Sequence, residues 1–510
     1  MEIADLLLSL FPIGLVMFLM VRVHWKSLHA GMTGWASTLL IAGLHFGATP
    51  TVLFWAQVRG LFLALYVLYV IWGALLFYRV TETVGTIQSM AELLKRLSPS
   101  RAFQVLLIAW GFASFLESVS GFGVPAAIVA PLLVGMGFSP LLAVVLPSLG
   151  HAWAISFGSL GSPFYALLAA TGIDGALLAP WSAAYLGLTC LLMGAATLWA
   201  AGGFPALREC FLPLLVMSSV TAGVQLIGVT VGVWNIAAML GALAGLLVGS
   251  LWALSRNTRA PSFSPALLRK ALLPYALILL LIFAAQWILP LRAALNALTV
   301  QIQVPEVATT RGWTTPAGFT RGISPFGHTG ALLLYASLIA FVVSRLKGVL
   351  QAGSGPQIVQ QAVKRGMDAT PGILFMVAMA ATLDHAGMLP ILAQTLASVT
   401  GRAFPLVSPL IGALGAFVTG SNTNSNVLFG ALQRDIAQML GYAAPVILAA
   451  QNAGGALGST FAPAKVILGC STVGAGDQEG EVMRHLLKYA LAALGVLALL
   501  TWAITQGVPV

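Results

Sequence analysis

The chain has 510 residues, of which 59% are hydrophobic and only 7% are charged, and its formal net charge is +10. About a quarter of the residues of a soluble domain are charged, so this composition excludes the soluble classes and predicts a multi-spanning membrane protein. The positive charge does not indicate nucleic-acid binding, because most of the 24 lysines and arginines fall in short loops between apolar segments. The positive-inside rule accounts for that placement.

Ten apolar segments are long enough to be predicted as transmembrane helices. In chain order they are 4–21, 31–48, 58–78, 176–200, 211–232, 234–254, 271–290, 328–344, 371–387 and 489–506. Two further regions, 103–172 and 405–474, are apolar but interrupted by Gly, Pro, Ser and Asn. At roughly 35–40 residues for each span and its loop, the length predicts about 12–14 crossings. The predicted fold class is an all-α polytopic membrane protein.

The interrupted regions divide the chain into five predicted parts. Residues 1–102, 173–404 and 475–510 are expected to form ordinary transmembrane helices, the first set as a scaffold. Residues 103–172 and 405–474 are each expected to form a hairpin followed by an interrupted helix, and together they make the predicted transport core.

The hairpins are predicted from the length of their arms. Each arm of 103–136 has about 15 residues, or about 22 Å of helix, which is shorter than the ~30 Å hydrocarbon core. We therefore expect 103–136 and 405–440 to enter the membrane and turn back. Such backbone is tolerated only where it is buried in protein or lines a watery cavity.

Both interrupted regions continue with the motif Gly-Ser-x-x-x-Pro, at 158–163 and 458–463. Basic residues of four loops are predicted to be cytoplasmic: Arg22 and Lys26; Lys95, Arg96 and Arg101; Arg256, Arg259, Arg269 and Lys270; Arg345, Lys347, Lys364 and Arg365. This topology puts both termini outside and makes the two regions enter from opposite faces. Inverted repeats with matching helix breaks indicate the binding site of a secondary transporter.

Glu117 lies at the tip of the first predicted hairpin, in SFLESVSGFGVP at 114–125. An ionisable group at membrane depth is costly and is a functional candidate by default, so Glu117 is predicted to carry the coupled proton. The alternative is a structural carboxylate that caps backbone N–H groups of the turn. Ser118, Gly121 and Gly123 of the same stretch are predicted substrate contacts.

The stretch GSNTNSN at 420–426 supplies hydroxyl and amide groups without net charge. A helix that starts at about residue 427 would direct its free N–H groups and positive dipole end towards this break. Its side chains can bind a carboxylate or a small cation, whereas a plain helix cap needs only one such residue. The predicted substrate-binding residues here are Ser421, Asn422, Thr423, Ser425 and Asn426.

Four more polar residues lie in the interrupted crossings. Gln451 and Asn452 are predicted substrate contacts, and His151 is either a proton relay, a substrate contact or a satisfied core histidine. Lys465 either pairs with an anion or extends to the membrane surface. Asp384 and His385 are predicted to form an interfacial hydrogen-bonded pair.

The sequence shows no metal-ligand spacing, phosphate-binding loop or nucleophile motif, so no cofactor or bound metal is expected.

These segments resemble the lactate permease family of bacterial 2-hydroxy-monocarboxylate transporters. The resemblance is carried by 114–128, 145–163, 420–433, 448–463 and 479–491, and it extends over essentially the whole chain. It implies a proton symporter for L-lactate, D-lactate or glycolate in the bacterial inner membrane. The Ser-Asn-Thr triplet at 421–423 is also similar to the hairpin signature of sodium-coupled carboxylate transporters that use an elevator motion.

Two positions depart from the family pattern. At 422 an acidic residue is expected and Asn422 is present, and at 151 a neutral amide-like residue is expected and His151 is present. Both changes make the site more positive, which leaves the anion and the proton route open.

The predicted function is therefore proton-coupled symport of a small organic anion, with the lipid bilayer and no nucleic acid as partners. The alternatives are sodium coupling, a sulfonate or dicarboxylate as the substrate, and, from another class, a polytopic membrane enzyme. The assembly state stays open, with a homodimer as one option.

Overall fold

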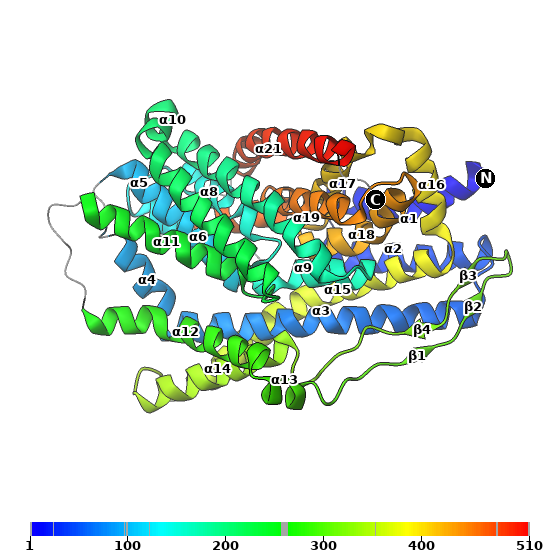
Figure 1. Cartoon of the computed structure of the whole chain (residues 1–510), viewed down its shortest axis with the longest axis horizontal. Helices are drawn as coiled ribbons and strands as arrows, with labels where there is room; N and C mark the ends of the chain where they lie inside the picture. Colours follow the sequence, from blue (N-terminus) through cyan, green and yellow to red (C-terminus); the bar gives the residue numbers. More distant parts are fainter. Residues whose placement is uncertain are drawn as a thin grey trace.

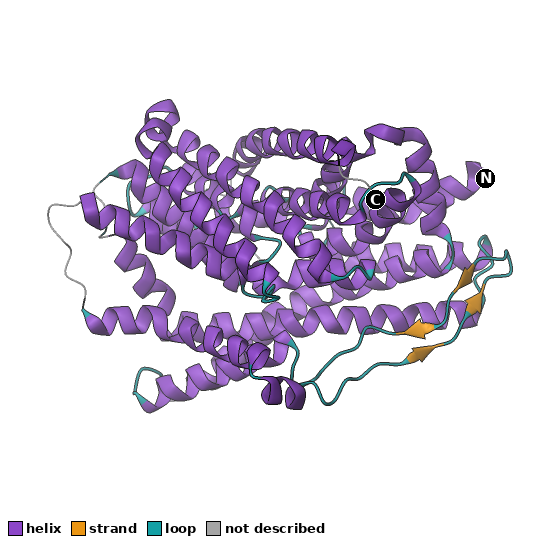
Figure 2. Cartoon of the chain, in the orientation of Figure 1, coloured by secondary structure: helices purple, strands orange, loops and turns teal. Residues whose placement is uncertain are grey.

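The protein is helical almost throughout in the computed structural model, which describes residues 3–23, 25–95, 97, 100–121, 123–256, 264–351, 353–475 and 478–507 (Figures 1 and 2). Two of the predicted loop cations, Arg96 and Arg259, lie outside the described residues. The predicted all-α polytopic class is confirmed.

The N-terminal part consists of four helices: α1 (Ile3–Val21), α2 (Ser27–Leu44), α3 (Pro50–Val84) and α4 (Thr86–Lys95). The part between the two interrupted regions consists of α10 (Gly175–Thr230), α11 (Ala237–Arg256), α12 (Pro265–Trp287), α13 (Leu289–Leu295), α14 (Thr329–Leu346), α15 (Ser354–His385) and α16 (Met388–Thr400). The chain ends in α21 (Glu479–Gly507). In Figure 1 the long helices α3 and α15 run side by side.

The two interrupted regions fold in the same order, as two helices joined by a short turn and then a broken helix. The first comprises α5 (Arg101–Val105), the π-helical η1 (Leu106–Phe112), α6 (Ala113–Val119), α7 (Val124–Val134), α8 (Pro140–Gly150), η2 (Ala152–Ala154) and α9 (Gly158–Thr171). The second comprises η3 (Gly401–Ala403), α17 (Phe404–Thr419), α18 (Asn422–Met439), α19 (Ala444–Thr460) and α20 (Pro463–Ser471).

The two arms of the first hairpin differ in length more than the sequence predicted. The first arm of the first hairpin is one 19-residue helical run from 101 to 119, whereas its second arm, α7, has 11 residues. Pro125 is the second residue of α7 and the residues after 134 form a turn, so this arm is short at both ends. The arms of the second hairpin have 16 and 18 residues.

Among the described residues, 10 helices are long and apolar enough to cross a membrane, or 11 if the bent pair 140–154 and 158–171 counts as one span. This is fewer than the predicted 12–14. One reason is that α10 counts once, although it contains the predicted spans 176–200 and 211–232 on the two sides of a break at Gly202 and Gly203.

A β-ribbon that the sequence did not predict follows α13. Its strands are β1 (Gln303–Val304), β2 (Val307–Ala308), β3 (Thr314–Thr315) and β4 (Gly318–Phe319). β1 pairs with β4 and β2 with β3, both antiparallel, in the registers Gln303 to Phe319 and Val307 to Thr315. Hydrogen bonds donated by three arginines hold the ribbon and its flank to the N-terminal helices. Arg311 donates to Asp5, Arg59 donates to the carbonyl of Pro316, and Arg321 donates to the hydroxyl of Tyr66.

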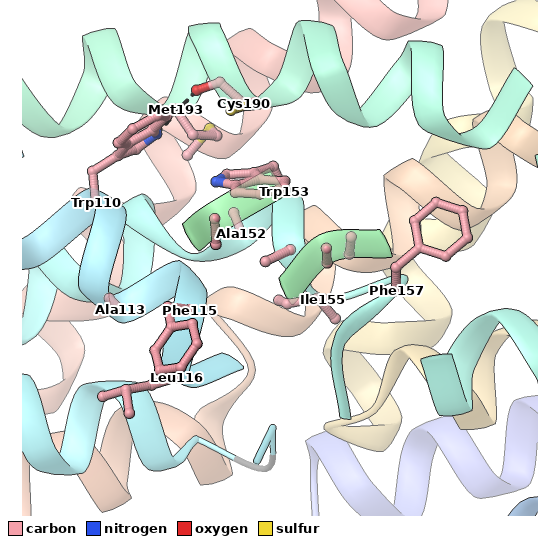
Figure 3. Close-up of a cluster of buried hydrophobic side chains, with 14 of the residues drawn as sticks. Trp110, Ala113, Phe115, Leu116, Ala152, Trp153, Ile155, Phe157, Cys190 and Met193 are labelled. Atoms are coloured by element: carbon pink, nitrogen blue, oxygen red, sulfur yellow. Dashed lines mark hydrogen bonds between the residues drawn. The ribbon is translucent and has the colours of Figure 1, made fainter. Parts of the chain in front are cut away.

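A tightly packed aromatic core fixes the broken helix of the first region (Figure 3). Trp110 of η1 lies 6.5 Å from Trp153 of η2 between ring centroids, and its indole N–H donates to the carbonyl of Cys190 at 3.1 Å. Both tryptophans are about 1% exposed. Because side chains in such a core have few alternative packings, the break between α8 and α9 is held in one place.

Candidate functional site

A cavity of about 120 Å³ lies where the turns of both hairpins meet the two helix breaks. We call it the central cavity, and its polar lining residues are Ser27, Glu117, Ser159, Ser162, Thr419, Ser421, Asn422, Thr423, Asn424, Ser459 and Lys465. Segments about 300 residues apart in the chain thus meet at one point. The sequence placed Glu117 and the 421–423 triplet in one predicted transport core, and both line this cavity.

The turn of the second hairpin is only two residues long, Gly420 and Ser421. Gly420 has φ of +71°, a conformation that glycine adopts without strain. The Ser421 hydroxyl accepts from the N–H of Asn424 and caps α18. The helix therefore starts at Asn422 and not at about 427 as predicted, because one cap suffices and packing against α19 outweighs the weak helix propensity of Asn, Ser and Thr.

Starting the helix at Asn422 separates the polar residues of this stretch into different faces. Asn422 and Asn426, one turn apart, both point to Asn452 of α19, and their Nδ2 atoms donate to its Oδ1 at 3.2 and 2.9 Å. Asn422 also donates to Ser156 Oγ at 3.2 Å, and Asn426 to the carbonyl of Pro163 at 3.0 Å. Asn426 and Asn452 thus join the hairpin to both broken helices from behind the cavity.

Ser425 and Gln451 form a second polar layer that does not line the central cavity. The Nε2 of Gln451 donates to Ser425 Oγ at 3.1 Å, and Gln433 donates to Gln451 Oε1. Ser408 closes this network on α17 by donating to Gln433 Oε1 at 2.5 Å. The helix break of the second region lies at 461–462, so Gln451 and Asn452 sit within an unbroken α19 and not at the break as predicted.

Glu117 occupies the last turn of α6 and is 2% exposed. Its Oε2 has no hydrogen-bond partner among the described residues. A buried carboxylate oxygen without a partner is costly, which favours a functional group over the structural cap that the sequence left open. Ser118 instead donates to the carbonyl of Ser114 within its own helix.

His151 lies behind Glu117, at the end of α8, and it does not line the central cavity. Its Nε2 is 3.8 Å from Glu117 Oε2. Its Nδ1 lies 2.5 Å from the carbonyl of Pro147, which can only accept, so Nδ1 carries the proton. The Nε2 lone pair of the neutral ring therefore faces Glu117.

Lys465 is the only cation among the residues that line the central cavity. It follows the break between α19 and α20, and its Nζ donates to Ser459 Oγ at 2.5 Å. The ammonium thus stays inside the protein beside Glu117. With Glu117 it gives the cavity one positive and one negative group.

The backbone of the first break is wound left-handed at Ser159, Leu160 and Gly161, with φ of 47°, 54° and 82°. Such a conformation costs a non-glycine residue roughly 1–2 kcal/mol. It opens the backbone beside the cavity, and the Ser159 side chain is directed at Gly121 of the first hairpin turn. A Cβ on Gly121 would lie 1.7 Å from Ser159 Oγ.

We expect Gly121→Ala to destabilise the protein by about 1–3 kcal/mol more than Gly137→Ala, as overpacking does elsewhere. Both glycines have positive φ, +62° and +85°, but a Cβ on Gly137 meets no atom of the described residues within 4 Å. The comparison of thermal midpoints in detergent therefore isolates the contact with Ser159. Equal losses in the two variants would show that the turn does not touch the break. Gly123, at φ of +77°, packs near Lys465.

The sequence did not single out six of the polar residues of the cavity wall: Ser27, Ser159, Ser162, Thr419, Asn424 and Ser459. The Gly-Ser-x-x-x-Pro motifs at 158–163 and 458–463 pointed to the segments of Ser159, Ser162 and Ser459 but not to these side chains. Ser27 starts α2 and carries no local signal.

The arrangement is suited to a small anion that also carries a hydroxyl group. Lys465 and the hydroxyls of Ser421 and Thr423 are donors for a carboxylate, as are the free N–H groups at the start of α18. The Oδ1 atom of Asn424 has no partner among the described residues and is an acceptor for a hydroxyl, whereas the Oδ1 atom of Asn422 packs against Gly455 of α19. Ile155 and Ile373 supply the apolar part of the wall.

Comparisons with known proteins identify permeases as relatives over nearly the whole chain. A putative L-lactate permease of Haemophilus influenzae is 28% identical over 545 residues, covering 97% of this chain and 98% of the relative. Glycolate permease GlcA of Escherichia coli is 26% identical, covering 97% and 94%. The L-lactate permease of Bacillus subtilis is 25% identical, covering 97% and 95%.

Two solved transporter structures align over most of the chain at low scores. The YdaH transporter of Alcanivorax borkumensis gives a TM-score of 0.45 at 15% identity, covering 96% of this chain and 90% of that one. MtrF of Neisseria gonorrhoeae gives 0.43 at 14% identity, covering 93% and 85%. Scores this low support no conclusion about the present chain.

The family model described as L-lactate permease matches residues 5–506. Since the relatives are permeases, the prediction of a membrane transport protein and not an enzyme is confirmed. The chain belongs to the L-lactate permease family.

Proposed function

We propose that the chain is a symporter that moves a small 2-hydroxy monocarboxylate, L-lactate or glycolate, with one proton across the bacterial inner membrane. The observation that carries the proposal is the central cavity, which joins one cation, one acid and a set of neutral polar groups. The names of the relatives, L-lactate permease and glycolate permease, support the substrate class.

In this proposal the carboxylate of the substrate lies on Lys465 and the start of α18. Ser421 and Thr423 donate to it, and the substrate hydroxyl donates to the free Oδ1 of Asn424. A monocarboxylate that lacks the hydroxyl leaves this buried acceptor unpaired, which lowers its affinity.

Charge balance in the cavity couples the proton to the anion. The empty cavity is neutral when Lys465 is charged and Glu117 is ionised. A bound monocarboxylate adds a charge of −1, so the loaded cavity is neutral only if Glu117 takes up one proton. The anion alone leaves a net charge of −1 and the proton alone leaves +1, and either net charge is costly to carry through a low-dielectric interior. The cavity is then carried across the membrane only when it is empty or when it holds both the anion and the proton.

The two departures from the family pattern fit this scheme. Because 422 is Asn and not an acid, Glu117 is the only acid among the residues that line the cavity. We therefore expect one proton per anion. His151 presents a lone pair towards Glu117 Oε2 at 3.8 Å. A small shift of either side chain would bring them within hydrogen-bond distance, so His151 serves as the relay.

We further propose that the two interrupted regions move as one unit. They supply the walls of the central cavity except for Ser27 of α2 and Ile373 of α15, which supply the opposite wall. A slide of the hairpin-bearing unit past α2 and α15 would expose the cavity to each side in turn. Re-entrant hairpins and an elevator motion belong to this proposal.

We also propose that both termini lie outside, because of the end of the molecule at which the basic loop residues gather. In Figure 1 α1 begins at the end of the molecule where the β-ribbon lies, and α21 ends towards that side. The C-terminal end of α11, with Arg256, lies at the opposite end together with the start of α12. Basic residues at that end are cytoplasmic under the positive-inside rule.

Uptake by purified protein in proteoliposomes tests the function. With an imposed pH gradient, acid outside, we expect labelled L-lactate or glycolate to accumulate above equilibrium, and a protonophore to abolish this. A sodium gradient without a pH gradient is expected to drive no accumulation. Accumulation driven only by sodium would replace proton coupling by the sodium alternative, and no uptake of either acid would reject the substrate class.

A further inference from the structure

A second cavity, of about 190 Å³, lies between α3, α9, α15 and α18, and we call it the outer cavity. Its charged and titratable lining residues are Arg59, Arg321, Asp384 and His385. The residues Phe319, Thr320 and Arg321, at the end of the β-ribbon, form one wall. The cavity shares no lining residue with the central cavity.

The helices α9, α15 and α18 each line both cavities, and the spacing of their lining residues gives the distance between the two. Pro163, Ile373 and Asn424 line the central cavity, whereas Ala170, Ala380 and Ala431 line the outer one. Each pair is separated by seven residues of continuous helix, or about 10 Å at 1.5 Å per residue. The outer cavity is therefore displaced by two helical turns along all three walls, towards the end of α15 where the β-ribbon packs.

Two buried polar atoms of the residues that line the outer cavity have no hydrogen-bond partner among the described residues. His385 is 3% exposed, and its Nε2 has no hydrogen-bond partner among the described residues. Its Nδ1 lies 2.9 Å from the carbonyl of Ala381 and donates to it, so Nε2 is a free acceptor in the neutral ring. The Nε of Arg59 is buried and also lacks a partner in the described part of the chain.

The charges of the outer cavity favour an anion. Two guanidinium groups, Arg59 and Arg321, face one carboxylate, Asp384. The Asp384 carboxylate lies 3.9 Å from His385 Nδ1, too far for the hydrogen bond that the sequence predicted for this pair. Arg434 and Asp435, one turn further along α18, pair with each other at 2.7 Å and so add no net charge.

From these observations we infer that the outer cavity is a second binding site for a small 2-hydroxy carboxylate, a waypoint between the outside and the central cavity. Arg59 and Arg321 hold the carboxylate, and the hydroxyl donates to His385 Nε2. Arg321 also lines a larger cavity of about 910 Å³ on its other side, where Arg292 adds a further cation. The inference rests on the proposed function for its substrate class.

Binding of labelled L-lactate to the full chain in detergent, measured by equilibrium dialysis, tests the inference. We expect two lactates per chain in the wild type and one in Lys465→Gln. Adding Arg59→Gln and Arg321→Gln to Lys465→Gln should remove the second lactate. Adding Arg311→Gln instead should leave it, because this arginine of the same ribbon pairs with Asp5 and lines neither cavity.

Transport kinetics provide a second readout that does not depend on weak binding. Arg59→Gln and Arg321→Gln singly are expected to raise the KM for L-lactate about tenfold, since each removes a charge-assisted hydrogen bond, with the maximal rate within about twofold. Arg311→Gln should leave the KM unchanged. Elution as a single species in size-exclusion chromatography confirms that each variant is folded.

The outcomes separate the two proposals. If the wild type binds one lactate and Lys465→Gln binds none, or if both arginine variants keep the wild-type KM, the outer site is rejected and the proposed function stands. If the wild type neither binds nor transports L-lactate or glycolate, the proposed function fails and the outer site fails with it. Propionate, which lacks the hydroxyl, should bind Lys465→Gln about tenfold more weakly than lactate; equal affinity would remove His385 from the site.

Discussion

Lys465→Gln is expected to reduce proton-driven uptake of L-lactate by about 100-fold or more. Lys465 is the only cation among the residues that line the central cavity, and its Nζ is already held there by Ser459 Oγ. Without it, a bound monocarboxylate keeps a net charge of −1 in the cavity even when Glu117 is protonated. Removing one member of a buried charge pair costs roughly 3–5 kcal/mol, which corresponds to a factor of about 100 or more in rate.

The measurement is uptake in proteoliposomes at matched protein density, with Lys488→Gln as the control. Lys488 lies on α21, over the ring of Tyr489, and lines none of the three cavities discussed above. Both variants lose one lysine, so a change in overall charge or reconstitution affects them equally. Wild-type uptake by Lys465→Gln would show that the carboxylate binds elsewhere and would leave the charge-balance scheme without its cation.

The sequence could predict much of this site because helix breaks and ionisable groups are rare at membrane depth. Glu117 stands out in an apolar stretch, and GSNTNSN at 420–426 has more polar side chains than the one that a plain helix cap needs. The membrane limits such segments to protein-lined positions. That constraint is enough to expect the two hairpin turns to meet, as they do in the wall of the central cavity.

Other features depend on tertiary contacts that no local pattern carries. Asn422 and Asn426 are helical because Asn452 of α19 and Ser156 hold them, whereas their propensity alone favoured a longer break. Ser27 joins the cavity only because α2 packs against α15 beside it. Arg59 is one arginine in a long helix, and its place in the outer cavity depends on a β-ribbon that follows more than 240 residues later.

Glu117→Gln is expected to separate net transport from exchange. With a neutral side chain at 117, the empty cavity carries the charge of Lys465 alone, whereas the cavity loaded with a monocarboxylate is neutral. The empty form should therefore cross slowly and the loaded form at a normal rate. We expect net uptake driven by a pH gradient to fall about 100-fold, by the same cost of an unpaired buried charge, and lactate counterflow to stay within about threefold of the wild type.

The two assays on one preparation distinguish this mechanism from simple loss of structure. A misfolded variant loses counterflow together with uptake, whereas a variant blocked only in the return of the empty carrier loses uptake alone. Glu481→Gln, at the exposed start of α21, is the matched control and should keep both activities. If Glu117→Gln still accumulates lactate against its gradient at the wild-type rate, Glu117 is a structural carboxylate. The coupled proton must then be carried by another group, of which His151, 3.8 Å away behind the cavity, is the nearest candidate.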